Sequence, residues 1–199
     1  MGVGIFSTRF VSPFSQFEQW YAEARSLPLG NPTAMVLATA DEQGRPSMRV
    51  VLLKQWNIDG FVFYTNLKSK KAQNLAVNPH ASLLFFWDDL GKQIRIEGRV
   101  EEIPREASEL YFHSRPRESQ WGAWASEQSQ QLDSYARLNE RYDFYREKYP
   151  DRVPLPDFWG GYILIPDYFE FWQSSKYRLH HRLVFERKNN KWVAKLLYP

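Results

Sequence analysis

The chain has 199 residues, a formal net charge of +3 and no cysteine, and 17% of its residues are aromatic. This length suits one domain that buries most of its apolar surface, and the lack of cysteine excludes disulfides, thiolate metal sites and a cysteine nucleophile. The small positive surplus is compatible with phosphorylated ligands and is too small to indicate nucleic-acid binding.

Targeting signals are also missing from the sequence. No apolar run is long enough to span a bilayer, and residues 1–10 lack the basic-then-apolar plan of a signal peptide. The four histidines show no metal-ligand spacing. We therefore expect a cytoplasmic protein with no membrane partner, no nucleic-acid partner and no bound metal.

The first half of the chain predicts a helix followed mainly by strands. Ser12-Pro13 is typical of a helix start, and an apolar helical face then continues to the break at Pro28. From residue 34 the apolar period becomes that of strands. The expected elements are strands at Ala34–Ala40, Ser47–Lys54 and Gly60–Thr65, a short helix at Ser69–Val77, and a hairpin of Ala81–Trp87 with Gln93–Ile103.

The second half predicts helices first and strands afterwards. The expected helices are Pro104–His113, a short one at Ser119–Ser126, and Gln131–Tyr149. The expected strands are Gly161–Ile165, Tyr168–Gln173, Leu179–Arg187 and Lys191–Leu197, with a hairpin turn at Asn189-Asn190. Short strands with turn signals and few helices favour a mainly β (α+β) fold, an antiparallel barrel with appended helices.

The organisation is that of a single domain over residues 1–199, because the sequence contains no repeat, low-complexity tract or second domain. Within it we distinguish an N-terminal segment with its helix (1–30), a helical insertion (104–149) and the C-terminal strands (161–199).

The most informative stretch spans residues 169–182, where an aromatic block precedes an Arg-Leu-His-His-Arg run. In an extended chain, period-two alternation puts Arg178, His180 and Arg182 on one face. Two guanidinium groups and an imidazole on one face suit a bound anion and a reaction in which charge develops. The alternative is an edge strand with a solvated basic face.

Two further groups of cations lie at strand ends. Arg49 and Lys54 bracket an apolar run, and their odd spacing in a regular strand aims them at opposite faces, so each could serve a different anion. The segment 63–71 is a strand that enters a helix start with three lysines, where amides and lysines attract phosphate. Alternatively, both groups are simply solvated charges.

A third group surrounds a predicted helix end. Tyr111 and Arg115 are four residues apart and share a face if the helix persists that far. Together with the Ser119 hydroxyl they make a plausible phosphate pocket. The alternative is a polar junction between a helix and a loop.

These four motifs, which follow one another along the chain in the family's order between Asn31 and Pro199, resemble the pyridoxine (pyridoxamine) 5'-phosphate oxidases, FMN enzymes that make pyridoxal 5'-phosphate. The resemblance implies an FMN-binding split barrel that works as a homodimer. It places FMN contacts at Arg49, Val50, Val51, Leu52, Leu53, Lys54, Tyr64, Thr65, Lys70, Lys71, Gln93, Gln128, Ser129, Trp172 and Arg182. Of these, Gln128 and Ser129 are expected to reach FMN held largely by the other subunit.

The resemblance also implies a substrate site and a reaction. The implied substrate-binding residues are Lys54, Tyr111, Arg115 and Ser119 at the phosphate, and Arg178 and His180 as catalytic residues at the reacting face. The implied reaction is oxidation of pyridoxamine 5'-phosphate or pyridoxine 5'-phosphate by O2 to pyridoxal 5'-phosphate. It releases hydrogen peroxide and, from the amine, ammonia.

Three features depart from the family pattern. His181 stands where the family usually has Asp, Asn or Glu, and Lys70 stands where it commonly has Arg. The longer basic leader that helps cover the active site in many members finds no resemblance before Ser12. Two alternatives therefore remain: a non-catalytic split-barrel protein that binds FMN or pyridoxal phosphate, and a split-barrel flavoprotein that reduces another substrate with FMN or a deazaflavin.

Overall fold

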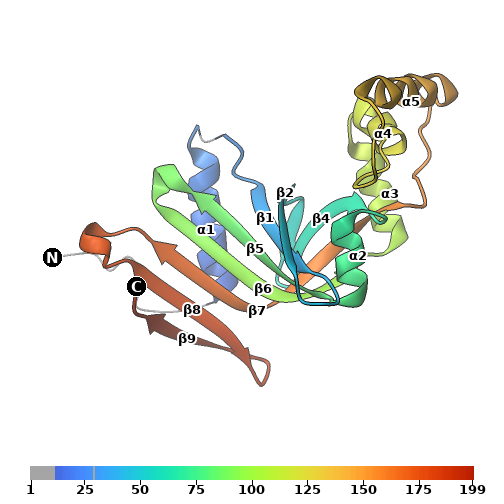
Figure 1. Ribbon diagram of the computed structural model, residues 1–199. Coiled ribbons are helices and arrows are strands. Elements are labelled where there is room, and N and C mark those ends of the chain that lie inside the picture. Colours follow the sequence, from blue (N-terminus) through green and yellow to red (C-terminus); the bar gives the residue numbers. More distant parts are fainter. Residues whose placement is uncertain (1–11, 29) are drawn as a thin grey trace.

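The computed structural model describes residues 12–28 and 30–199, so the expectations for residues 1–11 lie outside the described part. The strands of the described chain all belong to one antiparallel sheet (Figure 1). Its strands are β1 (Ala34–Ala40), β2 (Pro46–Leu52), β3 (Gln55–Asn57), β4 (Gly60–Asn66), β5 (His80–Trp87), β6 (Lys92–Glu102), β7 (Trp159–Gln173), β8 (His181–Lys188) and β9 (Lys191–Leu197). The predicted mainly β fold with appended helices is confirmed.

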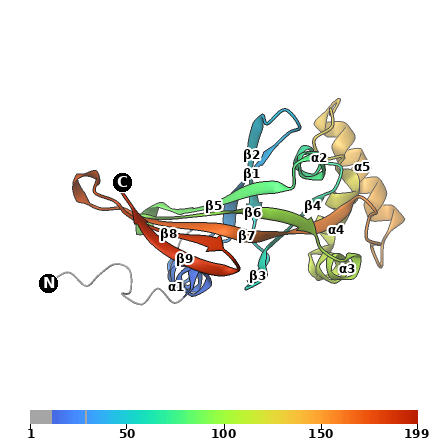
Figure 2. The same cartoon turned by 90° about the horizontal axis from the view of Figure 1, so that it is seen from below.

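Strand β7 organises the sheet, whose order is β2-β1-β5-β6-β7-β4-β3, with β8 pairing both β7 and β9. On one side β7 pairs with β6 along most of its length. On the other side its first half pairs with β4 and its second half with β8. Figure 2 shows the β1–β2 hairpin standing away from the plane of β5 to β7, so the sheet is curled rather than flat.

The sequence predicted two strands, 161–165 and 168–173, but the structure forms the single strand β7. The pairing with β6 shifts register between Glu97 and Gly98, opposite Pro166. Such a bulge accommodates proline, which has no N–H to donate to the ladder. Gly98 is required at this point, because a Cβ there would lie 2.1 Å from the carbonyl oxygen of Ile165.

Helix α1 (Pro13–Ser26) covers one face of the sheet (Figure 2). As predicted, it starts at Ser12, whose hydroxyl accepts a hydrogen bond from the Phe14 amide at 3.2 Å. It buries Phe17 and Trp20 in the main apolar core, and each such side chain contributes roughly 1.5–3 kcal/mol through burial.

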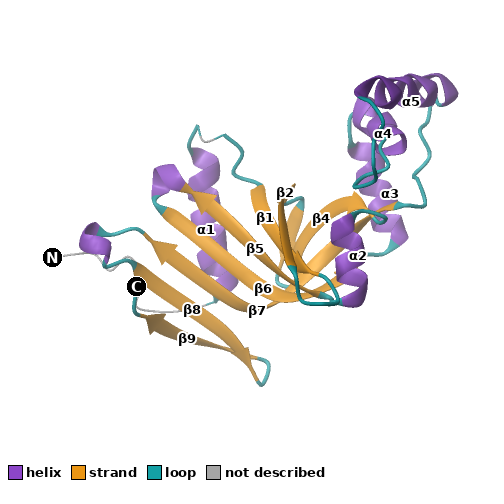
Figure 3. Cartoon of the chain, in the orientation of Figure 1, coloured by secondary structure: helices purple, strands orange, loops and turns teal. Residues whose placement is uncertain are grey.

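The other helices gather at the end of the sheet where β7 begins (Figures 1 and 3). They are α2 (Lys70–Val77), α3 (Arg105–Ser114), α4 (Arg117–Ala125) and α5 (Tyr135–Lys148). Phe112, Val153 and Trp159 form a second, smaller apolar cluster there. Helix α5 begins four residues later than predicted, because Ser134 caps it. No helix in the described part is long and apolar enough to cross a membrane.

Two short turns of 3-10 helix complete the fold, η1 (Asp88–Leu90) and η2 (Lys176–Arg178). Within η2, Tyr177 and Arg178 have φ of 57° and 61°, a left-handed conformation that is uncommon outside glycine. The predicted strand 179–187 is therefore wrong at its start, since β8 begins only at His181. The predicted Asn189-Asn190 turn and strand 191–197 are confirmed.

Candidate active site

A cavity of about 810 Å³ opens between the sheet and the helices at the α2–α4 end. Strands β2 and β4 and helices α2, α3 and α4 line it, together with the first residue of β7. Many residues that the sequence singled out meet here. They are Arg49, Val50, Val51, Leu52, Lys54, Tyr64, Thr65, Lys71, Tyr111, Arg115, Ser119 and Gln128.

Arg49 is held at one wall of the cavity by neutral oxygens. Its Nη1 donates to the Leu37 carbonyl at 3.1 Å and to Thr39 Oγ1 at 2.9 Å, and its Nη2 donates to Ser47 Oγ at 2.7 Å. These bonds use three of the five N–H donors of a guanidinium group and leave two for a ligand. Burial lowers the pKa of Arg49 from its ordinary value.

Lys71 lies beside Arg49 and is almost completely buried, with 8% of its surface exposed. Its Nζ donates to Gln128 Oε1 at 2.7 Å, Thr65 Oγ1 at 2.9 Å and Ser69 Oγ at 3.2 Å. Burial and the charge of Arg49 lower the pKa of Lys71 to about 8. Two buried cations that repel each other are stabilised when an anion binds between them.

Gln128 belongs to the same chain as the cations that it contacts. The sequence-based expectation was that Gln128 reaches across from the other subunit. Within its own chain, its Oε1 accepts hydrogen bonds from Lys71 and Thr65, and its contact with FMN across the interface stays a prediction. These bonds form because the loop after α4 brings residues 126–128 over the end of β4, where Asn66 Nδ2 also donates to the Ser126 carbonyl.

No carboxylate lines the cavity among the described residues, although Arg49, Lys54, Lys71 and Arg115 all do. Buried cations are normally paired with an acidic group. Here the hydrogen-bond partners of Arg49 and Lys71 are hydroxyls, an amide oxygen and a backbone carbonyl. This donor set is suited to a phosphate group, and the cavity is large enough for a ring system attached to it.

Arg49 and Lys54 do not serve opposite faces of a strand, contrary to the prediction from their odd spacing. Strand β2 ends at Leu52, so strict alternation does not continue to Lys54. Both residues line the same cavity. Two anionic groups bound there would therefore lie in one shared space.

A second group of cavity residues surrounds Tyr111 and Arg115. The rings of Tyr64 and Tyr111 stack with centroids 4.0 Å apart, and Trp159 continues the stack 5.4 Å from Tyr64. The guanidinium carbon of Arg115 lies 4.8 Å from the Trp159 ring centroid. Its Nη1 is buried without a hydrogen-bond partner among the described residues. A buried donor without a partner is costly, so this atom is a ready contact for an anion.

Sequence reasoning missed Trp159, which supports Tyr64, Tyr111 and Arg115 together. It read the following Gly160-Gly161 simply as a strand entry. In fact a Cβ on Gly161 would lie 2.7 Å from the Tyr64 ring, so this glycine leaves room for the stack. A Trp-Gly-Gly run at the start of a strand was the available signal.

Three expected FMN contacts lie near this end of the sheet but do not line the cavity. Leu53 is buried in the main core with 4% exposure. Lys70 is exposed at the first position of α2. Ser129, with φ of 72°, lines a neighbouring hollow beside α5 instead.

The remaining predicted residues lie at the opposite end of β7. Gln93 pairs with Trp172, and Trp172 pairs with Arg182, across three adjacent strands. The His180 ring lies 4.6 Å from the Trp172 ring, and its Nδ1 accepts a hydrogen bond from the Ser175 amide. Arg178 is exposed in η2. Because η2 interrupts the extended chain, the prediction that Arg178, His180 and Arg182 alternate along one strand face is wrong.

Glu170 fixes Arg182 at this end. The buried carboxylate accepts from Arg182 Nε at 2.6 Å and from Arg95 Nη2 at 3.0 Å, and the Tyr168 hydroxyl donates to it at 3.1 Å. Burial alone would raise the pKa of Glu170, but the Arg182 hydrogen bond and the Arg95 charge hold it below its ordinary value. Arg182 also donates to the Tyr198 carbonyl at 2.9 Å.

The two sets of residues are far apart within one chain. Trp159 lines the cavity at the first residue of β7, while Trp172 is the penultimate residue of this 15-residue strand. At about 3.3 Å per residue, the two tryptophans are on the order of 40 Å apart along the strand. A single small ligand cannot touch both sets on the same chain.

Solved structures define the class of this fold. A pyridoxamine 5'-phosphate oxidase-related, FMN binding protein from Nostoc punctiforme PCC 73102 matches 96% of this chain with a TM-score of 0.75, at 16% identity, over 100% of its own length. The expected split-barrel fold of FMN-binding proteins is therefore confirmed. PhzG from Burkholderia lata 383, solved with tetrahydrophenazine-1-carboxylic acid, matches with a TM-score of 0.90 and 31% identity, over 94% of this chain and 93% of PhzG.

Sequence comparisons identify the family. Residues 22–142 match the pyridoxamine 5'-phosphate oxidase model, and residues 159–199 match the pyridoxine 5'-phosphate oxidase C-terminal dimerisation region. Relatives named pyridoxine/pyridoxamine 5'-phosphate oxidase are 47% identical in Haemophilus influenzae and 51% identical in Burkholderia cenocepacia, over 94% of this chain and 90% and 89% of theirs. The chain belongs to the pyridoxine/pyridoxamine 5'-phosphate oxidase family.

Membership has three direct consequences. The chain is an oxidoreductase that acts on a small molecule. Its cofactor is FMN. The matched dimerisation region supports a homodimer.

Proposed function

We propose that this enzyme oxidises pyridoxamine 5'-phosphate and pyridoxine 5'-phosphate with O2 to pyridoxal 5'-phosphate. Hydrogen peroxide is the second product, and the amine substrate also releases ammonia. The observation that carries the proposal is the carboxylate-free cavity with two separate groups of anion-binding side chains, one around Arg49 and Lys71 and one around Tyr111 and Arg115. One group serves the phosphate of FMN and the other the phosphate of the substrate.

We assign the FMN phosphate to the first group because Lys71 is buried and because hydrogen bonds hold both Arg49 and Lys71 in place. The substrate phosphate belongs to the second group. There Lys54, Tyr111 and Ser119 line the same cavity as Arg115, whose Nη1 has no hydrogen-bond partner among the described residues. FMN held at its phosphate by Arg49 and Lys71 would supply the redox chemistry, as the acceptor of the hydride from the substrate's C4' carbon and the donor of electrons to O2.

We call Gln93, Trp172, Arg178, His180 and Arg182 the signature residues and their end of β7 the signature end. In this proposal they enter each cavity from the other subunit. On one chain Trp172 lies on the order of 40 Å along β7 from the cavity, and the dimerisation region covers these same C-terminal strands. Arg178 and His180 of one protomer would then face the substrate held by its partner. Gln93, Trp172 and Arg182 would contact the flavin from the same side.

The chain's own groups orient the substrate and bias its charge. Arg178 is exposed in η2, so its side chain is free to approach the reacting carbon once the partner's cavity lies opposite it. His180 accepts a hydrogen bond at Nδ1, which leaves Nε2 as the ring nitrogen that can donate to a ligand. When the phosphate and the reacting face of the substrate are both held, less translational and rotational entropy is lost on the way to the transition state.

The 31% identical relative PhzG was solved with a phenazine carboxylic acid, which makes a different substrate the second candidate. The phosphate-binding group around Arg115 favours a phosphorylated vitamer, as do relatives at 47% and 51% identity. The test is to supply purified holoenzyme with pyridoxamine 5'-phosphate in air and to follow pyridoxal phosphate and peroxide, with unphosphorylated pyridoxamine as the matched control.

Fast turnover of the phosphorylated amine and slow turnover of pyridoxamine are expected. Equal turnover of the two would contradict phosphate recognition by Arg115. A flavin-loaded protein that converts neither would be a binding protein, which is the remaining alternative.

A further inference from the structure

Asn74 is a buried polar residue that the site assignments leave without a function. It lies in the interior of α2 with 5% of its surface exposed. Asparagine is unfavourable inside a helix compared with alanine or leucine. Its burial there indicates that its side chain makes specific contacts.

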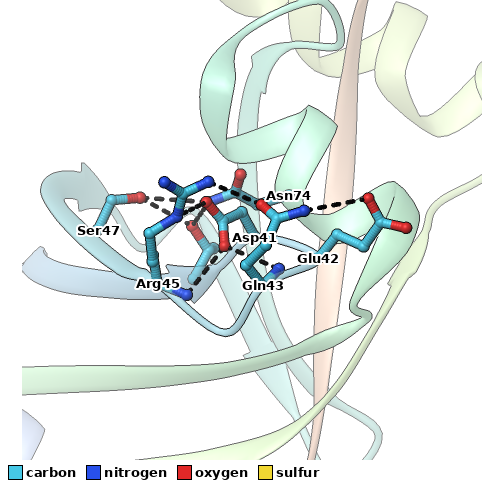
Figure 4. Close-up of polar contacts among 7 residues, drawn as sticks. Asp41, Glu42, Gln43, Arg45, Ser47 and Asn74 are labelled. Atoms are coloured by element: carbon cyan, nitrogen blue, oxygen red, sulfur yellow. Dashed lines mark hydrogen bonds and ion pairs between the residues drawn. The ribbon is translucent and has the colours of Figure 1, made fainter.

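Those contacts lead to the phosphate-binding arginine. Asn74 Nδ2 donates to Thr39 Oγ1 at 3.0 Å and to Ser47 Oγ at 3.2 Å (Figure 4 shows Asn74 and Ser47 beside the β1–β2 turn). The same two hydroxyls accept from Arg49, at 2.9 Å and 2.7 Å. Asn74 and Arg49 thus hold opposite sides of one pair of hydroxyl groups.

The network has few ways to rearrange. Thr39 is 3% exposed, so water cannot easily replace its partners. Each hydroxyl oxygen has two acceptor sites and accepts from both Asn74 and Arg49, and the two hydroxyls also lie within 3.5 Å of each other. The amide group therefore fixes the hydroxyls, and the hydroxyls fix two N–H groups of the guanidinium fork.

Helix α2 consequently supports both Arg49 and Lys71. Lys71 and Asn74 are three residues apart and lie on the same side of the helix. Lys71 reaches the cavity directly, whereas Asn74 acts on the cavity through Thr39 and Ser47. One rigid element thus sets the spacing between the two charges that a phosphate would bridge.

We infer that Asn74 is a positioning residue that sets the geometry of Arg49 for the phosphate of FMN. This inference rests on the proposed assignment of Arg49 to that phosphate. Because the effect is specific to the phosphate, it must disappear when the flavin has none. Riboflavin carries the same isoalloxazine ring without the phosphate, and it is the probe that separates positioning from a general structural role.

The experiment measures the dissociation constants of FMN and of riboflavin by fluorescence quenching with apo-protein. The variants are Asn74→Leu, Ser47→Ala and, as the control on the same helix, Gln73→Ala, whose side chain is exposed. Losing one neutral hydrogen-bond contribution should weaken FMN about three- to tenfold in the first two variants. Riboflavin binding should stay unchanged in both, and the control should alter neither flavin.

Equal losses for FMN and riboflavin would show that Asn74 only maintains the fold and would overturn the inference. Unchanged FMN affinity in Asn74→Leu would overturn it as well. If Asn74→Leu fails to fold, Ser47→Ala decides by the same two criteria. Arg49→Ala calibrates the assay: if that variant weakens both flavins equally, the proposed phosphate site itself is wrong, whereas a loss confined to FMN there leaves only the role of Asn74 in question.

Discussion

The cations at the two ends of β7 have different kinds of hydrogen-bond partner. At the cavity end, Arg49 and Lys71 are bonded to neutral oxygens, and no carboxylate lines the space around them in the described chain. At the other end, Arg182 and Arg95 share the buried carboxylate of Glu170. The difference teaches that the cavity keeps its charge available for an anion, while the signature end uses ion pairs to fix an arginine in place.

The two ends also differ in how complete they are. The cavity is lined by regular elements and holds its side chains in hydrogen bonds or ring stacks. Arg178, in contrast, is exposed on a turn. One end is organised within a single chain, whereas in the proposed function the other end acts only when a second chain lies against it.

Subunit mixing is the strongest test of this comparison. Arg49→Ala damages the cavity and Arg178→Ala damages the signature end, so each homodimer should be nearly inactive. In a mixed dimer, one of the two sites combines an intact cavity with an intact signature end. Random pairing after co-refolding should therefore restore about a quarter of wild-type activity.

The control for subunit mixing pairs two cavity variants, Arg49→Ala with Arg115→Ala. Each site of that mixed dimer has a damaged cavity, so at a substrate concentration well below the raised KM of Arg115→Ala no activity should return beyond that of the two homodimers. If the Arg49→Ala and Arg178→Ala mixture also stays inactive while mixed dimers are demonstrably present, the two ends do not combine across subunits.

Substitutions at the two ends should change different steady-state parameters, KM at the cavity end and kcat at the other end. In the proposed site, Arg115 contacts a phosphate that does not change during the reaction, so its binding is equal in ground and transition states and affects KM. A charge-assisted hydrogen bond is worth roughly 1.5–3 kcal/mol, so Arg115→Ala should raise KM about ten- to a hundredfold. Arg178→Ala should instead lower kcat at saturating pyridoxamine 5'-phosphate. A reversed pattern would mean that the two roles are exchanged.

Local patterns predicted much of the fold. Strands 34–40 and 191–197 were predicted with the correct bounds, because alternation and turn residues are encoded within the strand itself. The η2 turn could not be predicted, since Tyr177 and Arg178 adopt left-handed backbone conformations that their residue types do not favour. Tertiary context overrode the local preference there.

The candidate site was predictable only in part, for a similar reason. The cations of the cavity stand in recognisable motifs, but Trp159 and Asn74 act through partners far away in the sequence. Trp159 meets Tyr64 from β4, and Asn74 meets Thr39 from β1. The separation of the site into two ends follows from the length of β7, which the sequence analysis had divided into two strands.

The pH dependence of FMN binding should show that Lys71 works as a buried cation. Its pKa is lowered to about 8, so the free protein loses this charge as the pH rises through 8, while a phosphate monoester stays doubly charged above its second pKa of about 6. The dissociation constant of FMN should then rise by up to about tenfold per pH unit above 8.

Two variants provide the comparison for the pH experiment. Lys71→Arg should flatten the profile, because arginine stays charged in this range. Lys70→Ala should change the affinity only slightly, since Lys70 is exposed beside the cavity. Apo-protein stability should respond oppositely to FMN affinity: the charged Lys71 is unfavourable in the fold below pH 8, and this penalty disappears as the pH rises toward the ordinary value of 10.5.

The smallest effect is expected for His181→Asp, which tests how much the signature end depends on its exposed residues. His181 begins β8 opposite Gln173 and is exposed, whereas Arg182 pairs opposite Trp172 and points to the other face. Arg182 already has Glu170 as its carboxylate partner, so a new acidic neighbour adds little. We expect kcat and KM within about twofold of wild type, as for most exposed substitutions. A large loss of turnover would show that His181 itself takes part in the reaction.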